Sequence, residues 1–222
     1  MPDRLQGEAG MEKLRELITD DLMLKAIIES IDPQEPVKVS NVPFPWSVLG
    51  CGNYAAVFCH PDYEDYAVKI YAPGRPGLEE EAEVYKLLGH HPAYARCYYI
   101  GSTFLILDRL HGVTFYDSMK QGILITEQAI RDIDYALDYA RSRGLQPHDV
   151  HAKNVMIRDG RGLIVDVSDF LKQEDCSMWE DYKKAYYRLY RPIASRWIFP
   201  VPRTILEIVR KAYKWRKRNN RR

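Results

Sequence analysis

The stretch Pro147–Phe170, PHDVHAKNVMIRDGRGLIVDVSDF, is the most informative part of the sequence because it combines side chains that can bind protons or metal ions with two short apolar runs. The runs are Val155–Ile157 and Leu163–Val165, and apolar, β-branched runs of this length predict strands. Asp159-Gly160 between them is a typical hairpin turn. We therefore expect a β-hairpin whose open end carries polar side chains.

Three polar residues meet at that open end. Asp149 and Asn154 lie on the loop before the first strand, and Asp166 follows the second strand. One carboxylate can orient an attacking hydroxyl, while an amide oxygen and a second carboxylate are hard ligands that suit Mg²⁺. A hairpin with ordinary turn acids explains the pattern equally well, so the upstream chain has to decide between the two interpretations.

The upstream stretch Leu49–Phe58, LGCGNYAAVF, has the pattern of a phosphate-binding turn. Gly50 and Gly52 lie two apart, Ala55 takes the third small position and Val57 follows two residues later. A missing Cβ lets backbone N–H groups approach phosphate oxygens closely. A plain β-hairpin with glycines in its turn is the alternative.

The next predicted strand, Tyr66–Ile70, decides in favour of the phosphate-binding turn. It reads YAVKI and places Lys69 among apolar residues, where an unpaired ammonium group would be costly. Lys69 therefore requires an anion.

In this order, the motifs resemble those of the protein-kinase-like superfamily: G-x-G-x-x-A-x-V, then A-V-K, then H-D-V-H-A-K-N. The resemblance covers residues 48–170. It implies that ATP lies over the glycine-rich turn, that Asp149 accepts the proton of the acceptor hydroxyl, and that Mg²⁺ is bound by Asn154 and Asp166. The resemblance also implies a set of nucleotide-binding residues, namely Gly50, Gly52, Ala55, Val57, Ala67, Lys69, Asp108 and Leu110.

The resemblance implies that Lys69 bridges the nucleotide phosphates and a glutamate on the helix that follows its strand. Leu78–Leu88, LEEEAEVYKLL, is a good helix former with several acids. Glu81 shares one helix face with Val84, Tyr85 and Leu88, the face that packs on the sheet. We therefore predict Glu81 as the partner of Lys69, with Glu80 as the alternative.

A hinge is expected between two lobes. Strands are predicted around 96–100 and 103–107, and Leu107–Gly112, LDRLHG, resembles the segment that joins the kinase lobes. The resemblance implies that backbone groups from Asp108 to Leu110 meet adenine.

Two of the departures from the family pattern lie in the stretch Pro147–Phe170, beside the modest change to Ala55 in the glycine-rich turn and the absence of an Ala-Pro-Glu motif. Pro147-His148-Asp149 replaces the family's His-Arg-Asp, so the arginine that commonly binds an activating phosphate is missing. Activation by loop phosphorylation is therefore not expected. Lys153 is expected to place its ammonium near the transferred phosphate, and His151 to make a structural hydrogen bond. The Asp-Phe-Gly motif is replaced by a stretch with two acids, of which Asp166 is preferred as metal ligand because it ends the strand, whereas Asp169 could cap a following helix.

Composition restricts the function classes. The 222 residues include 32 basic and 31 acidic ones, so a polyanion-binding protein is not indicated overall. The four cysteines lack zinc-site spacing. No signal core or membrane-spanning run is present, and a cytoplasmic protein is expected.

Helices are predicted on both sides of the kinase-like region. Residues 11–31 have near-helical apolar spacing and should pack on the small lobe. Thr126–Arg143 should be a helix under the 148–154 loop, stopped by Gly144. Residues 178–197 predict an aromatic and basic helix broken near Pro192.

The C-terminal stretch from 203 to 222 has nine Lys or Arg and one Glu. The favoured interpretation is a terminal helix that packs through its apolar side and frays at its basic end. The alternative is a docking surface for an anionic membrane or for RNA.

We thus expect one α+β domain with a two-lobed protein-kinase-like fold, comprising an N-terminal helical extension (1–39), an antiparallel-sheet N-lobe (40–108) and a reduced helical C-lobe (109–222). The expected function is ATP- and Mg²⁺-dependent phosphoryl transfer to a hydroxyl, as in a serine/threonine kinase. The short C-lobe also resembles compact RIO-like and lipopolysaccharide kinases, so a small-molecule or glycolipid kinase is the alternative enzyme. A non-catalytic scaffold or nucleotide sensor is the alternative from another class.

Overall fold

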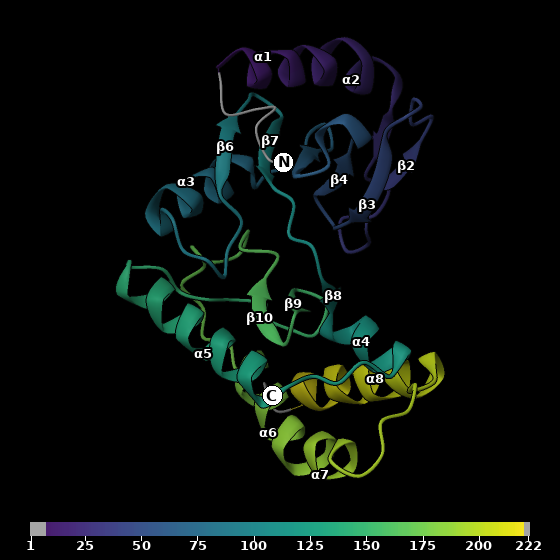
Figure 1. Cartoon of the computed structure of the whole chain (residues 1–222), viewed down its shortest axis with the longest axis vertical. Coiled ribbons are helices and arrows are strands. Elements are labelled where there is room, and N and C mark those ends of the chain that lie inside the picture. Colours follow the sequence, from purple (N-terminus) through teal and green to yellow (C-terminus); the bar gives the residue numbers. More distant parts are fainter. Residues whose placement is uncertain (1–7, 220–222) are drawn as a thin grey trace. The chain divides into compact units, whose positions relative to one another are not determined.

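The computed structural model describes residues 8–219, with side chains at 9–213 and 215. The chain divides into two compact units (Figure 1). The sheet unit comprises residues 8–90 and 95–110, and the helical unit comprises residues 91–94 and 111–219. The sequence predicted a lobe boundary after residue 108, two residues before the sheet unit ends at residue 110. That residues 91–94 belong to the helical unit was not expected.

The sheet unit is built on a five-stranded antiparallel sheet with the order β3-β4-β5-β7-β6. A 3₁₀ turn, η2 (Pro61–Tyr63), joins β4 to β5. The strands predicted at Tyr66–Ile70, 96–100 and 103–107 agree with the observed ones within one residue. All but one connection are short, as antiparallel neighbours allow. The strands are β3 (Ser47–Cys51), β4 (Ala55–Cys59), β5 (Tyr66–Tyr71), β6 (Cys97–Ile100) and β7 (Phe104–Asp108).

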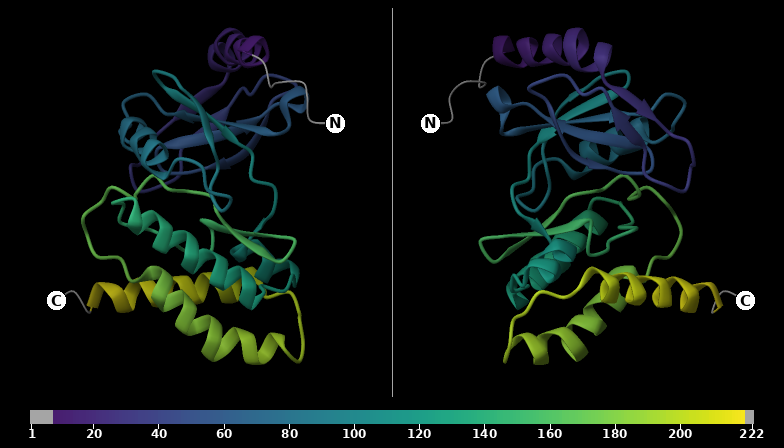
Figure 2. Two further views of the ribbon diagram at one scale, coloured as in Figure 1. Left: turned by 60° about the vertical axis from the view of Figure 1, so that its left-hand side comes forward. Right: turned by 90° about the vertical axis from the view of Figure 1, so that its right-hand side faces the viewer.

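An N-terminal helical run covers one face of this sheet (Figure 2). It consists of α1 (Glu8–Leu17), the π-helical turn η1 (Ile18–Leu22) and α2 (Met23–Lys25). Leu14 and its apolar neighbours are fully buried against sheet residues such as Phe58. The predicted packing of this helix on the small lobe is confirmed.

The helix is shorter than predicted. It ends at Lys25, because Ala26 is extended and Ile27–Glu29 forms β1, which pairs with β2 (Lys38–Ser40). The β-branched pair in β1 favours a strand once a partner strand is near. Leu24, the middle residue of α2, is 75% exposed.

The other face of the sheet receives α3 (Leu78–Leu88), which has the predicted bounds. Its buried side chains include Glu81 and Val84. Successive side chains of a strand point to opposite faces. Because Val68 and Ile70 lie in the core under the N-terminal helices, Lys69 points to the α3 face.

The helical unit contains the predicted hairpin in a three-stranded sheet with the order β10-β9-β8. The hairpin turn lies at the predicted Asp159-Gly160. The elements before the C-terminal helices are β8 (Val113–Thr114), α4 (Phe115–Gln121), α5 (Glu127–Ser142), β9 (Val155–Arg158) and β10 (Arg161–Ile164).

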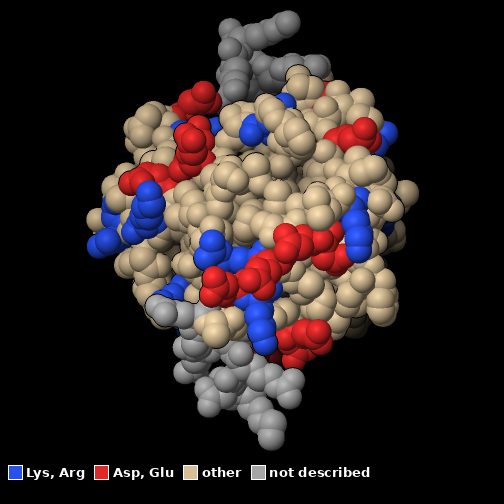
Figure 3. Space-filling view, turned by 90° about the horizontal axis from the view of Figure 1, so that it is seen from above, with Lys and Arg blue, Asp and Glu red and all other residues tan. Residues whose placement is uncertain are grey.

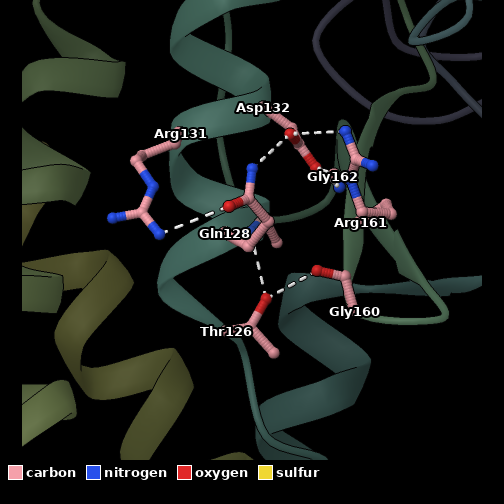
Figure 4. Close-up of polar contacts among 8 residues, drawn as sticks. Thr126, Gln128, Arg131, Asp132, Gly160, Arg161 and Gly162 are labelled. Atoms are coloured by element: carbon pink, nitrogen blue, oxygen red, sulfur yellow. Dashed lines mark hydrogen bonds and ion pairs between the residues drawn. The ribbon is translucent and has the colours of Figure 1, made fainter.

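Two residues fix this hairpin to α5 (Figure 4). Asp132 is buried, and its carboxylate accepts hydrogen bonds from Arg161 Nε (2.7 Å) and from the Gly162 N–H (3.0 Å). The Thr126 hydroxyl caps α5 by accepting from the Ala129 N–H and donates to the carbonyl of Gly160 (2.7 Å). These bonds hold the hairpin, and hence the loop that precedes it, on a rigid helix.

The aromatic helix of residues 178–194 is continuous, so the predicted break near Pro192 is wrong. It comprises α6 (Met178–Ala185), the π-helical turn η3 (Tyr186–Tyr190) and α7 (Arg191–Ala194). Pro192 lies in the first turn of α7, directly after the π turn, where a missing N–H disrupts least.

The last helix, α8 (Arg203–Asn219), does not pack through its apolar side. Ile208 and Val209 are exposed, while Leu206 and Tyr213 on another side of the helix are half-buried. The predicted packing of the apolar side is therefore wrong for Ile208 and Val209, and the predicted fraying of the basic end falls largely outside the described residues.

One face of the molecule carries mixed charge. On the face shown in Figure 3, acidic and basic side chains lie interspersed, as the near-equal numbers of the two predict. No helix among residues 8–219 is long and apolar enough to cross a bilayer.

Candidate active site

The glycine-rich turn joins β3 to β4 in the sheet unit. The Gly52 N–H donates to the carbonyl of Ala55 (2.9 Å) and closes a tight turn. Neither Gly50 nor Gly52 has a positive φ. A Cβ on Gly50 would meet nothing within 4 Å, and one on Gly52 would make only an ordinary contact. The backbone therefore does not require these glycines, whereas a ligand that approaches the turn closely would require them.

The carbonyl groups of this turn are bound by the protein. Those of Gly52 and Tyr54 accept from the backbone N–H groups of Val37 (2.8 Å) and Ala72 (2.9 Å). Arg75 Nη2 lies 3.3 Å from the Asn53 carbonyl, and its guanidinium stacks on the Tyr54 ring. Among the described residues, the N–H groups of Asn53 and Tyr54 have no partner. The turn therefore offers donors, which suits phosphate oxygens.

Lys69 and Glu81 form a buried ion pair. Lys69 Nζ lies 2.8 Å from Oε1 and 2.7 Å from Oε2 of Glu81. The Glu81 side chain is 1% exposed and that of Lys69 is 13% exposed. The pair joins β5 to α3 through Glu81, the residue predicted from its position on the helix face. The alternative, Glu80, is exposed. A buried pair of this kind holds an ammonium in a fixed place at the cost of desolvating both groups.

Tyr71 is a third member of this cluster that the sequence interpretation missed. Its hydroxyl donates to Glu81 Oε2 and also lies 3.2 Å from the carbonyl of Gly77. Tyr71 is two residues beyond Lys69 on β5, so both side chains point to the same face. The alternation of side chains along a strand was the sequence signal that could have identified Tyr71.

The predicted adenine segment is only partly available for binding. The Asp108 N–H donates to the Arg96 carbonyl (2.9 Å), and the Asp108 carboxylate accepts from the Arg96 N–H (2.9 Å) and the Tyr98 hydroxyl (2.7 Å). In the described part of the chain the backbone of Leu110 makes no hydrogen bond. Leu110 therefore remains available to a ligand, whereas the Asp108 side chain stabilises the end of β7.

In the helical unit, Asp149 is held in an unusual conformation. Its φ is 56°, in the left-handed region that non-glycine residues rarely adopt. Its carbonyl accepts from Asn154 Nδ2 (3.1 Å). Backbone strain of this kind persists where the surroundings determine the conformation, and it is frequent at functional sites.

The pKa of Asp149 is raised above that of an ordinary aspartate, chiefly by burial. His151 acts in the opposite direction, and its Nε2 lies 3.8 Å from Asp149 Oδ2. The carboxylates of Asp169 and Asp166 raise the pKa further. A carboxylate whose pKa is raised is a better proton acceptor, which is what a general base needs.

Asn154 and Asp166 lie close together at the open end of the hairpin. The Asn154 carbonyl accepts from the N–H of Val165, the residue before Asp166 (2.9 Å). Asp166 Oδ1 accepts from the Ser168 N–H (3.1 Å). Because Asn154 Nδ2 is used by Asp149, the orientation of the amide is fixed and its oxygen is left for another partner.

The alternative metal ligand, Asp169, has a different environment. Its carboxylate lies 2.8 Å from Lys172 Nζ and 3.9 Å from His148 Nδ1. It caps no helix, because the next described helix is α6, which begins at Met178. The ion pair with Lys172 already neutralises part of the charge that Asp169 would offer to a cation.

Lys153 is exposed, and its Nζ lies over the Tyr116 ring, 4.8 Å from the centroid. Within the described residues it forms no ion pair with Asp149, so the structure does not bring these two predicted catalytic residues together. His151 Nδ1 accepts from the Lys153 N–H (3.3 Å), which is the structural hydrogen bond that was expected.

The donor set at the open end of the hairpin fits Mg²⁺. An oriented amide oxygen and a carboxylate are the hard oxygen ligands that Mg²⁺ takes from proteins, with substrate phosphates and water completing its shell. No cluster of three or more His, Cys, Asp or Glu side chains placed to hold a metal was found in residues 8–219.

No family model matches the chain. A protein of Bacillus subtilis (strain 168) named "Putative serine/threonine-protein kinase YrzF" is 32% identical over 173 residues, which are 76% of this chain and 79% of that protein.

The chain belongs to the protein-kinase-like superfamily. The predicted family and its α+β fold class are thereby confirmed.

Two solved kinase domains are also similar to this kinase-like chain. That of maize SIRK1, a sucrose-induced receptor kinase bound to AMP-PNP, has a TM-score of 0.45 and 18% identity over 54% of this chain and 49% of its own. That of Mycobacterium tuberculosis PknI has a TM-score of 0.42 and 20% identity over 55% of this chain and 57% of its own. The match thus spans about half the length of each domain.

Proposed function

We propose that this protein is an ATP- and Mg²⁺-dependent phosphotransferase that acts on serine or threonine hydroxyls. The observation that carries the proposal is the buried Lys69–Glu81 pair. An ion pair buried to this degree contributes little net stability, and replacing it with apolar residues is often neutral or favourable. A fixed ammonium beside a glycine-rich turn with two available N–H groups is, by contrast, what nucleotide phosphates require.

In this mechanism Lys69 binds the phosphates of ATP, and Glu81 fixes the position of Lys69. The donors of the glycine-rich turn bind the phosphate oxygens. The backbone of Leu110 contacts adenine. Positioning and charge neutralisation of this type supply most of the rate acceleration in phosphoryl transfer, because the reaction has little covalent chemistry for the protein to perform.

Asp149 accepts the proton of the attacking hydroxyl and orients its oxygen toward the γ-phosphate. Its raised pKa favours this role. Asn154 and Asp166 would hold Mg²⁺, which supplies charge neutralisation on the phosphates when bound. Lys153 is proposed to neutralise charge on the transferred group by turning from the Tyr116 ring toward it, a side-chain rotation open to an exposed lysine.

The name of the B. subtilis relative supports a protein hydroxyl as the acceptor. A small-molecule or glycolipid hydroxyl is the alternative acceptor. We also place the reaction in the cytoplasm, where ATP is abundant.

A labelling experiment distinguishes these acceptors. The purified chain is incubated with γ-labelled ATP, Mg²⁺ and fractions of a cell lysate, and label is followed into protein, lipid and soluble products. The proposal expects labelled phosphoserine or phosphothreonine with the wild type and none with Lys69→Ala. Lys86→Ala, which changes an exposed lysine of α3, is the matched control and should behave as wild type. Nucleotide binding without transfer to any fraction would instead support a nucleotide sensor.

A further inference from the structure

The helix α8 presents its apolar side chains to solvent. Ile205, Ile208, Val209 and Trp215 are between 50% and 65% exposed. Ile205, Ile208 and Val209 have the i, i+3, i+4 spacing of one helix face, and Trp215 extends this face by two turns. Helices of soluble proteins normally turn such a stripe toward the core, whereas α8 exposes it.

Polar contacts hold α8 in this orientation. Glu207 Oε1 accepts from the Tyr116 hydroxyl (3.2 Å), and the Tyr213 hydroxyl donates to Asp181 Oδ2 (2.9 Å). Burial raises the pKa of Tyr213 to about 12, with the Asp181 carboxylate contributing in the same direction, so the phenol remains a donor at neutral pH. Two polar side chains thus fix α8 to the helical unit, and its apolar stripe remains exposed.

The same helix is strongly basic. Its sequence, RTILEIVRKAYKWRKRN, contains seven Lys or Arg and one Glu. Among its described basic side chains, Arg203, Arg210 and Lys211 are exposed. An apolar stripe with Trp beside many basic residues is the signature of a helix that lies in the interface of an anionic membrane.

The chain that leads into α8 also exposes large apolar side chains. Trp197 is 77% exposed, and Ile193, Ile198 and Phe199 are each about half exposed. Tryptophan and phenylalanine favour the boundary between headgroups and acyl chains. Residues 193–215 therefore form one segment rich in exposed aromatic and aliphatic side chains, which we name the docking segment.

We propose that the docking segment binds the surface of an anionic lipid bilayer, with the apolar stripe of α8 inserted among the lipids and its basic residues at the headgroups. Charge complementarity selects this partner. A second copy of the chain would bring seven basic residues of one helix against seven of another, which is unfavourable. RNA would use the basic residues but would gain little from an aliphatic stripe.

Vesicle binding tests this inference with the full-length chain. Flotation with vesicles of equal parts phosphatidylglycerol and phosphatidylcholine is compared with flotation with phosphatidylcholine alone. The wild type should bind the anionic vesicles, should bind the neutral ones weakly, and should be released in part by high salt.

Two matched double variants separate insertion from simple charge attraction. Ile208→Ser with Val209→Ser removes two aliphatic side chains from the stripe and should lower vesicle partitioning by about tenfold or more. Leu24→Ser with Ile31→Ser removes two similarly exposed aliphatic side chains from the sheet unit and should bind as wild type. Both doubles should melt near the wild-type temperature, because all four positions are exposed.

Three outcomes would overturn the inference. The first is that the wild type does not bind anionic vesicles, and the second is that the two double variants bind them equally. The third is that the wild type binds single-stranded poly-uridylate more tightly than vesicles and that the Ile208→Ser, Val209→Ser double variant binds this RNA equally well. The last result would identify α8 as a nucleic-acid contact instead.

Discussion

The hydroxyl of Tyr71 donates a hydrogen bond to the carboxylate of Glu81, the same carboxylate that holds Lys69. Two neighbouring positions on one face of β5 thus converge on a single buried acid of α3. Lys69 supplies the charge that Glu81 needs, and Tyr71 limits the positions that the carboxylate can take. The ammonium of Lys69 is therefore positioned by two residues rather than by one.

We predict that Tyr71→Phe lowers both activity and stability. Loss of a hydrogen bond to a buried carboxylate should reduce the free energy of unfolding by about 1–3 kcal/mol. A less firmly held Glu81 should reduce kcat/KM for ATP by about tenfold. Urea unfolding and initial rates measure the two effects. Tyr135→Phe, at a 67% exposed position of α5, is the control, and a Tyr71→Phe enzyme with wild-type kinetics would show that Tyr71 has no positioning role.

The Lys69–Glu81 pair predicts a specific pattern of stabilities. Lys69→Met leaves a buried carboxylate without its cation and should destabilise the fold by about 3–5 kcal/mol. Adding Glu81→Gln removes that charge, so the double variant should be more stable than Lys69→Met alone, although both should be inactive. Chemical denaturation of the two variants measures the difference. If Lys69→Met and the double unfolded at the same urea concentration, the pair would not be coupled as the structure shows.

Two sets of glycines should respond differently to alanine. Gly50→Ala and Gly52→Ala have room in the protein, so their melting temperatures should match wild type while KM for ATP rises by about tenfold, because each added methyl occupies space that the phosphates need. Gly162→Ala places its Cβ 2.3 Å from the Ala129 carbonyl oxygen, so it should destabilise the fold by more than about 2 kcal/mol. Calorimetry and ATP titration of all three variants check this contrast. Equal loss of stability in the three would contradict it.

The raised pKa of Asp149 makes a prediction about pH. The folded state of this carboxyl binds its proton more tightly than the unfolded chain does, so protonation stabilises the fold. That stabilisation is complete below the unfolded pKa, near 3.9, and is lost as pH rises through the higher folded value. At neutral pH, Asp149→Asn should therefore be at least as stable as wild type, and its advantage should shrink as the solution is acidified.

Thermal melts of wild type and Asp149→Asn across this pH range measure the effect. Asp138→Asn, at an exposed position of α5, is the matched control and should show no such trend. The same raised pKa predicts that kcat/KM of the wild type declines on the acidic side at a pH above the ordinary titration range of aspartate. A neutral-pH Asp149→Asn variant that melted well below wild type would show that the charged carboxylate stabilises the fold.

Local sequence patterns predicted much of this architecture. The helix Leu78–Leu88 and its Glu81 followed from spacing along one helix face, and the hairpin of Val155–Arg158 and Arg161–Ile164 followed from apolar runs around Asp159-Gly160. These features are set within a few residues, so periodicity and turn chemistry are enough to identify them.

Features that depend on distant partners were not predicted. The short strand Ile27–Glu29 continues a helical pattern and becomes a strand because Lys38–Ser40 lies beside it. The outward face of α8 depends on Tyr116 and Asp181, which are remote in sequence from Glu207 and Tyr213. Spacing identifies an amphipathic helix, but the direction of its apolar face is decided by tertiary contacts.

The most direct test of the proposed activity is Mg²⁺-dependent ATP turnover by the purified chain, measured for wild type, Asp149→Asn and the Asp138→Asn control. We expect turnover in wild type and Asp138→Asn, and a loss of at least about a hundredfold in Asp149→Asn with ATP affinity retained. Turnover by Asp149→Asn at the wild-type rate would contradict the assignment of Asp149 as the base and, with it, the proposed mechanism.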